Sequence, residues 1–234
     1  MTRRRKLLLA VLGGVGTVVV LLGAALWWVV LRDDTPEEAT LVARQTVAPA
    51  RTGLDGTWTV VPGAEVFAGY RITEHLNGLD NTAVARTGEV EATVEVEDGR
   101  ITAVDAAVDM ASLTSQDTEL PGVGGRDDAM REAGLETGAF PTATFSLTEP
   151  LALGGLAEPG REVALDAVGV LELHGVARPV TVPVRARWSG EVIDLSASVE
   201  VALADFAIDP PAPQVVSVAD RGTVELQLTV ERAG

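Results

Sequence analysis

The chain contains two histidines, His75 and His174, and no cysteine, so it has few candidates for acid–base or metal chemistry. His75 follows Glu74 at the end of a predicted strand, where its ring could hydrogen-bond a ligand headgroup, although a surface or loop-anchoring role is favoured. His174 precedes a glycine in a tight connection, where the ring is expected to hold the loop backbone. No H-E-x-x-H or H-x3–5-H spacing occurs, so a histidine-based metal site is not expected.

Arg126 and Asp127 form the second candidate for polar chemistry. Their side chains could pair with each other beneath a lid, which is the favoured interpretation, or reach a ligand headgroup. They begin a predicted short helix, residues 127–133, which has an acidic first turn and includes Met130 on its apolar face. The sequence contains no Gly-x-Ser-x-Gly elbow and no Gly-rich phosphate loop. The sequence therefore predicts a protein that is not an enzyme, without catalytic residues or a bound metal. An envelope hydrolase that uses the histidines is the least favoured alternative.

The element around which the rest of the chain is organised is a predicted hairpin over residues 88–110. Apolar residues alternate with Glu, Thr and Asp on both sides of Asp98-Gly99, a sequence that suits a tight turn. Each arm of about 9 or 10 residues would extend roughly 30 Å. One face of the hairpin is aliphatic and the other acidic, so the aliphatic face must be covered by other strands.

The chain from Thr57 onward shows the same two-residue period, with turn residues between the runs. Eight or nine antiparallel strands are predicted, with residues 77–82 as a loop and no layer of helices to cover a sheet. Such strands must close into a barrel or pair as a sandwich. Pro183 falls within a predicted strand and indicates an edge, seam or bulge there.

The predicted inner face consists mainly of Val, Ala, Leu and Gly, and aromatic residues make up only 4% of the chain. Such small side chains would leave a hollow in an eight-stranded barrel, and a long aliphatic chain is the ligand that suits its walls. In a sandwich the same residues would allow two sheets to pack closely. The pattern leaves both architectures open, and the long strands and the helix that could serve as a lid favour the hollow barrel.

Several motifs follow one another in order between residues 57 and 230. They are Trp58, Gly69-Tyr70-Arg71-Ile72, Ala85-Arg86-Thr87-Gly88, Arg126-Asp127, Phe140-Pro141-Thr142-Ala143-Thr144-Phe145, Leu171-Glu172-Leu173-His174-Gly175-Val176 and Arg178-Pro179-Val180-Thr181-Val182. Together they resemble the YceI-like family of polyisoprenoid-binding, lipocalin-like proteins of bacterial envelopes. The resemblance implies an all-β, elongated, eight-stranded antiparallel barrel with one short lid helix. Its apolar tunnel would hold the isoprenoid tail of a quinone-like or polyprenol-like lipid.

The predicted binding site combines the strand pattern with this resemblance. The residues expected to line the lumen are Val66, Tyr70, Ile72, Val90, Ala92, Val94, Val104, Ala106, Val108, Phe145, Leu147, Leu171, Leu173, Val182, Val184 and Leu195. The expected mouth, where a headgroup would lie, consists of His75, Arg126, Asp127 and Met130. No cofactor is predicted, other than a bound isoprenoid lipid or quinone.

The N-terminal region predicts a single transmembrane helix. Residues 7–31 contain no charged residue, Asn, Gln or Pro, and a helix of this length spans the roughly 30 Å hydrocarbon layer. The basic residues 1–6 would remain in the cytoplasm. The segment is interpreted as an uncleaved signal anchor, with a cleaved signal peptide as the alternative. Residues 32–55 are expected to form an extracytoplasmic linker, and residues 56–234 the YceI-like lipid-binding barrel.

Charge restricts the partners of this protein. Residues 1–32 hold five of the 18 basic residues and none of the 34 acidic residues, so the remainder carries a net charge of −21. Such a surface would repel the phosphates of nucleic acids. The expected partners are an apolar isoprenoid lipid and the cell membrane, and the sequence leaves a monomer and a homodimer open. The predicted function is that of a membrane-anchored, extracytoplasmic lipid-binding barrel, and the alternative is a non-catalytic adhesion or scaffold module with a β-sandwich fold.

Overall fold

Residues 35–234 form one compact unit of the computed structural model, which describes residues 35–44, 53–63, 65–76, 79–116, 125–211 and 216–234. The predicted membrane segment, residues 7–31, lies outside the described residues. None of the helices in the described part of the chain has the length and hydrophobicity of a membrane span.

Twelve strands and five short helical segments make up this described part. The strands are β1 (Gly56–Val60), β2 (Phe67–Leu76), β3 (Leu79–Thr87), β4 (Val90–Glu97), β5 (Arg100–Asp109), β6 (Thr114–Ser115), β7 (Thr142–Leu147), β8 (Leu151–Ala152), β9 (Glu162–Leu173), β10 (Val176–Trp188), β11 (Val192–Ala202) and β12 (Val216–Arg232). The helical segments are η1 (Met110–Ser112), α2 (Arg126–Ala129), η2 (Met130–Gly134), η3 (Gly154–Ala157) and η4 (Leu203–Phe206). The predicted helix over residues 127–133 thus corresponds to α2 and η2, which follow each other directly.

Eight of these strands close into a barrel. The hydrogen-bonded order is β1, β4, β5, β7, β9, β10, β11 and β12, and β12 pairs with β1 to complete the ring. All pairings are antiparallel. The predicted eight-stranded antiparallel barrel with one short helix is therefore confirmed. The sandwich alternative is wrong, because a closed ring of strands does not divide into two separate sheets.

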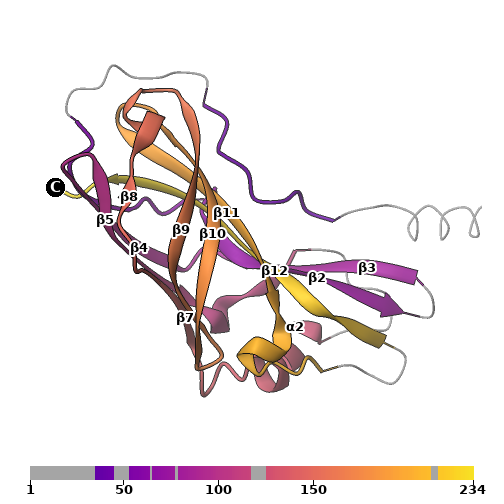
Figure 1. The fold of residues 1–234 in the computed structure, drawn as a ribbon. Coiled ribbons are helices and arrows are strands. Elements are labelled where there is room, and N and C mark those ends of the chain that lie inside the picture. The colour runs from indigo at the N-terminus through magenta and orange to yellow at the C-terminus, as the bar shows by residue number, and fades with distance from the viewer. Residues whose placement is uncertain (1–34, 45–52, 64, 77–78, 117–124, 212–215) are drawn as a thin grey trace, which may run out of the picture. The chain divides into compact units, whose positions relative to one another are not determined.

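β2 and β3 continue the paths of β1 and β4 beyond the ring. The last residues of β12, 230–232, pair with β1, and residues 216–227 pair with β2, so β1 and β2 lie end to end beside a single long strand. β2 and β3 form a hairpin, and β3 also pairs with β6. This hairpin projects at the end of the barrel where α2 lies (Figure 1). The predicted loop over residues 77–82 is wrong from Leu79 onward, because pairing with β2 overrides the local turn preference of Asp80 and Asn81.

The strands β9 and β10 show how the sequence pattern forms the barrel wall. In the second half of β9, Ala167, Gly169, Leu171 and Leu173 are buried, whereas the residues between them are half-buried or exposed. Pro183 of β10 is paired with β9, but β11 pairs with β10 only from Val184 onward. Pro183, which has no N–H to donate, therefore lies where the β11 side of its strand is not paired, in agreement with the predicted edge position.

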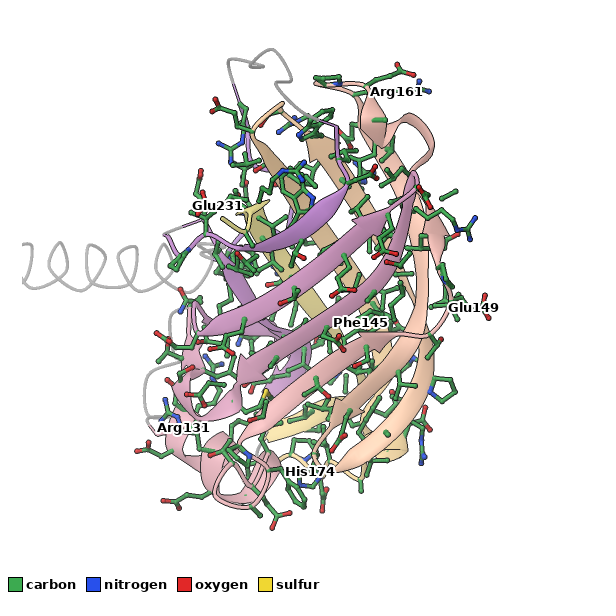
Figure 2. All side chains as sticks on the ribbon, turned by 90° about the vertical axis from the view of Figure 1, so that its left-hand side faces the viewer. Arg131, Phe145, Glu149, Arg161, His174 and Glu231 are labelled. Carbon is green, nitrogen blue, oxygen red and sulfur yellow. The ribbon has the colours of Figure 1, made fainter. Side chains whose placement is uncertain are left out.

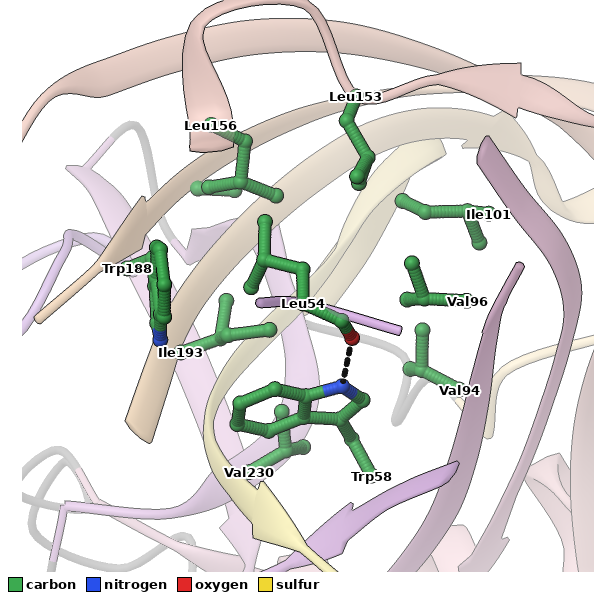
Figure 3. Close-up of a cluster of buried hydrophobic side chains, with 11 residues drawn as sticks. Leu54, Trp58, Val94, Val96, Ile101, Leu153, Leu156, Trp188, Ile193 and Val230 are labelled. Carbon is green, nitrogen blue, oxygen red and sulfur yellow. Dashed lines mark hydrogen bonds between the residues drawn. The ribbon is translucent and has the colours of Figure 1, made fainter. Parts of the chain in front are cut away.

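One end of the barrel is filled by large side chains, which we call the closed-end cluster (Figure 3). It consists of Leu54, Trp58, Val94, Val96, Ile101, Leu153, Leu156, Ala186, Trp188, Ile193 and Val230. The indole N–H of Trp58 donates to the carbonyl of Leu54 at 2.8 Å. The indole N–H of Trp188 is buried and has no acceptor among the described residues. Figure 2 shows Arg161 near this end, Phe145 midway and His174 at the end that carries α2.

The stability of the protein is expected to respond differently to substitution of Trp58 and of Trp188 by phenylalanine. Trp58→Phe leaves the buried carbonyl of Leu54 without its donor, whereas Trp188→Phe removes an N–H that has no described acceptor. We expect Trp58→Phe to lower the free energy of unfolding by about 1–2 kcal/mol more than Trp188→Phe. Urea denaturation of both variants measures this difference, and equal losses would show that the hydrogen bond of Trp58 does not stabilise the closed end.

Residues 35–44 lie on the outer wall of the barrel, and we call them the strap. The sequence predicts a linker throughout residues 32–55, but the strap is hydrogen-bonded to β2, β3, β10, β11 and β12. Outward-facing polar residues beneath it are buried, among them Asp194 and Glu225, which are 0% and 1% exposed. A linker in solvent would not bury these side chains, so this part of the predicted linker belongs to the folded unit.

Candidate functional site

The interior of the barrel contains two adjoining chambers. The inner chamber lies beside the closed-end cluster, and its border is apolar except for Thr144 and Glu225. These two residues occupy outward positions of β7 and β12, and Glu225 bonds to Arg86 and the strap on the outer wall. The inner chamber therefore presents aliphatic and aromatic side chains with no polar group directed inward among its bordering residues.

The outer chamber lies between β2, α2 and the loop that follows η4. Its border includes Met130 from η2 and Leu203, Pro210 and Pro211 from the far side, all of them half-exposed, so the chamber reaches the protein surface. Five residues border both chambers and form what we call the waist: Ala68, Val108, Ala143, Leu171 and Val224. The two chambers together make an apolar space that runs from α2 towards the closed end.

Most of the predicted lumen residues border these chambers. They are Tyr70, Ile72, Ala92, Val94, Val104, Ala106, Val108, Phe145, Leu171, Leu173, Val182, Val184 and Leu195. Gly169 helps to place Phe145, because a Cβ atom on this glycine would lie 2.5 Å from Cζ of the ring.

Three predicted lumen residues do not border either chamber. Val66 and Val90 are buried in a small cluster with Leu228, where the strand paths break between β1 and β2 and between β3 and β4. Leu147 packs against the closed-end cluster. All three residues have the inward phase of their predicted strands. Val66 and Val90 nevertheless lie where the strands are interrupted, and Leu147 lies near the closed end, so their side chains enter packed regions.

The polar residues at the border of the outer chamber include an ion pair between Arg126 and Glu74. Arg71 also borders this chamber, but its guanidinium bonds to the strap and pairs with Glu225. The guanidinium Nη1 of Arg126 lies 3.3 Å from Oε2 of Glu74, and the two side chains are 11% and 17% exposed. Asn81 also donates to this carboxylate at 3.3 Å. Glu74 was not among the predicted mouth residues, although it continues the inward phase of Ala68, Tyr70 and Ile72 and could have been found from it.

His75 and Asp127, both predicted at the mouth, have structural surroundings instead. His75 has the opposite phase to Glu74, so its half-exposed ring lies outside the barrel, 2.6 Å from Asp80 on the paired strand. The carboxylate of Asp127 accepts from the backbone N–H of Ser115 at 3.1 Å and from its hydroxyl. Asp127 thus fastens α2 to β6, and Arg126 pairs with Glu74 rather than with Asp127, the pairing that the sequence favours.

His174 has the loop-anchoring position that the sequence predicts. It occupies the tight turn between β9 and β10 with φ of 52°. Its Nδ1 lies 3.1 Å from the carbonyl oxygen of Phe206, and its Nε2 lies 3.0 Å from Oε2 of Glu136. The ring also contacts Phe140 edge-on, with centroids 4.6 Å apart. These contacts hold the connections at the α2 end together, and neither histidine borders the two chambers.

Comparison with known families gives a match to the YceI-like domain over residues 58–230, which is most of the chain. The chain belongs to the YceI-like family. The matched range begins at Trp58 within β1 and ends at Val230 within β12, so it includes at least part of each of the eight strands of the ring. The family expected from the ordered motifs is therefore confirmed.

Relatives of this YceI-like protein agree with the fold. A UPF0312 protein of Vibrio vulnificus strain YJ016 is 31% identical over 112 residues, which is 45% of this chain and 52% of the relative. The match thus spans about half the length of that relative. A polyisoprenoid-binding domain from Saccharophagus degradans superposes with a TM-score of 0.56 at 16% identity, over 75% of this chain and 98% of the other. BcnA of Burkholderia cenocepacia gives 0.51 at 17% identity, over 68% and 95% of the two chains.

Proposed function

We propose that this YceI-like barrel binds a long-chain isoprenoid lipid, such as a polyisoprenoid or a quinone with an isoprenoid tail, and that it does so without chemical conversion. The observation that carries this proposal is the inner chamber, whose bordering side chains offer no inward polar group. A polar ligand would lose its hydrogen bonds to water there without replacement. A hydrocarbon tail instead gains about 0.8 kcal/mol for each buried CH₂ group. The polyisoprenoid-binding description of the Saccharophagus degradans domain supports the same ligand class.

The proposed orientation places the tail in the inner chamber and the headgroup beside Arg126 and Glu74. These two residues are the charged pair at the border of the outer chamber, and the pair supplies both a hydrogen-bond donor and an acceptor. Met130 and Tyr70 would contact the first part of the tail. In this orientation the tail passes between the waist residues on its way from the outer chamber to the inner chamber.

The proposed location is the outer face of the cell membrane. Residues 7–31 would act as a single-pass anchor with residues 1–6 in the cytoplasm, because basic residues precede the apolar run and acidic residues follow it. An anchored barrel would stay close to the bilayer, where isoprenoid lipids reside. Sequestering such a lipid requires binding alone, so no catalytic group is needed.

Lipid extraction tests the proposal. The full chain, purified in a mild detergent and washed, is expected to release an isoprenoid lipid in about equimolar amount when extracted with organic solvent and analysed by mass spectrometry. The protein should also bind an added isoprenoid quinone in calorimetric titration. Recovery of detergent alone, together with no heat of quinone binding, would contradict the proposed function.

A further inference from the structure

The N-terminal half of the strap is held through its backbone. Arg71 donates to the carbonyl of Pro36 at 2.8 Å, and Arg86 donates to the carbonyl of Glu37. In return, the N–H of Ala39 donates to Glu225 at 3.3 Å. Both arginines also pair with the buried carboxylate of Glu225, at 3.5 and 2.7 Å. One buried network therefore joins β2, β3, β12 and the strap.

The C-terminal half of the strap is held mainly through the side chain of Arg44. Arg44 forms two hydrogen bonds of 2.6 Å to the fully buried carboxylate of Asp194, and a third of 3.2 Å to Thr229. The hydrogen bond to Asp194 raises the pKa of the Arg44 guanidinium above its usual value. Val42 is 6% exposed, and its carbonyl accepts a hydrogen bond from Arg187. These contacts bury charged groups, which distinguishes them from the exposed ion pairs that contribute little.

The register of the strands gives the direction of the strap along the barrel. Arg71, which contacts the start of the strap, lies in β2 between Tyr70 and Ile72 of the outer chamber. Asp194, which contacts the end of the strap, follows Ile193 of the closed-end cluster. The chain that precedes the strap therefore joins the barrel at the level of the outer chamber, away from the closed end.

We propose that the strap is a clamp that holds the outer-chamber half of the barrel against a lipid surface. The proposal rests on the proposed membrane anchor. With the strap bound, only residues 32–34 separate the predicted span from the barrel, a reach of about 10 Å when extended. With the strap released, the attachment would lengthen to residues 32–52, because Leu54 remains packed in the closed-end cluster, and a coil of that length reaches about 25 Å. The acidic surface has no attraction for an anionic bilayer, so the short covalent attachment is what keeps the ligand entrance near the lipid.

Single labels on the full chain in vesicles test this clamp, and the absence of cysteine makes such labelling specific. Glu132→Cys places a dye on η2 beside the outer chamber, and Glu191→Cys places one in the turn next to the closed end. Energy transfer to a headgroup-labelled lipid is expected to be several-fold stronger from position 132 than from position 191. The double substitution Val42→Asp and Arg44→Ala should remove this difference. Arg185→Ala, which breaks an exposed pair with Glu162, is the matched control and should preserve it.

Hydrogen exchange of residues 35–44 verifies in the same samples that the strap is released only in the double variant. Equal energy transfer from positions 132 and 191 in the protein with an unaltered strap would overturn the proposal. So would a difference in energy transfer that persists after the strap is released. Failure of the chain to associate with vesicles would also overturn it. Quinone binding in detergent is measured separately and is expected to be the same with and without the strap contacts. A loss of that binding in all samples would count against the proposed ligand, while the transfer data would still decide the role of the strap.

Discussion

Replacing Ala143 by phenylalanine is expected to exclude the lipid tail from the inner chamber and to weaken binding about a thousandfold. Ala143 is 9% exposed and belongs to the waist, so an aromatic ring there would block the passage between the chambers. A tail that loses contact with five CH₂ groups forfeits about 4 kcal/mol of transfer free energy, which corresponds to roughly a thousandfold in Kd. Calorimetric titration of the full chain with an isoprenoid quinone in detergent measures the change.

The neighbouring residue provides a matched control. Thr142 precedes Ala143 in β7 and is exposed, so Thr142→Phe adds the same ring to the outer face and should leave Kd unchanged. Ala143→Phe should also retain most of its stability, because the ring enters empty space. In a packed core the same change would cost about 1–3 kcal/mol. Normal quinone binding by a folded Ala143→Phe variant would show that the ligand does not pass the waist.

Replacing Glu225 by alanine is expected to lower the free energy of unfolding by about 3–5 kcal/mol. The carboxylate is 1% exposed and pairs with Arg71 and Arg86, which are themselves 13% and 16% exposed. Its removal leaves two largely buried guanidinium groups without their carboxylate and also removes an acceptor for the strap. The melting temperature should fall by roughly 10 °C for a domain of this size. Thermal and urea denaturation monitored by circular dichroism measure both quantities.

Glu200→Ala provides the comparison for this prediction. Glu200 pairs with Arg221 at 2.6 Å, but the two side chains are 63% and 52% exposed. Its loss should change the free energy of unfolding far less than the loss of Glu225, because water screens and solvates such a pair. Similar losses for Glu225→Ala and Glu200→Ala would mean that the network beneath the strap is as weak as a surface ion pair.

The barrel could be predicted because each wall strand carries its own signal. The alternation in β4 and β9, the Asp-Gly turn between β4 and β5, and the scarcity of large side chains are local features, and local features are what a single sequence preserves. The edge position of Pro183 followed from the missing N–H in the same way. Strand phase also identified most residues that border the chambers.

Features that depend on distant pairing were not predictable in this way. The strap has no regular period, and its burial depends on Asp194 and Glu225, which lie about 150 residues or more further along the chain. The strand at Leu79–Thr87 forms against a turn-like local sequence because β2 supplies its partners. The strand phase of β2 does predict that Glu74 faces inward and His75 outward, so the correct mouth residue is present in the sequence pattern.

The long strand β12 has a consequence for how this protein reaches its native state. β12 pairs with β1, β2 and β11, and all three precede it in the sequence, with Trp58 paired to Arg232 across almost the whole domain. The ring therefore cannot close while the ribosome is still producing the chain ahead of β12. Contacts of such high contact order form slowly, since a long loop must be ordered before they are made. The nascent chain would therefore lack its closed ring, and remain flexible, until β12 emerges. A polypeptide in this state can still pass through a translocation channel.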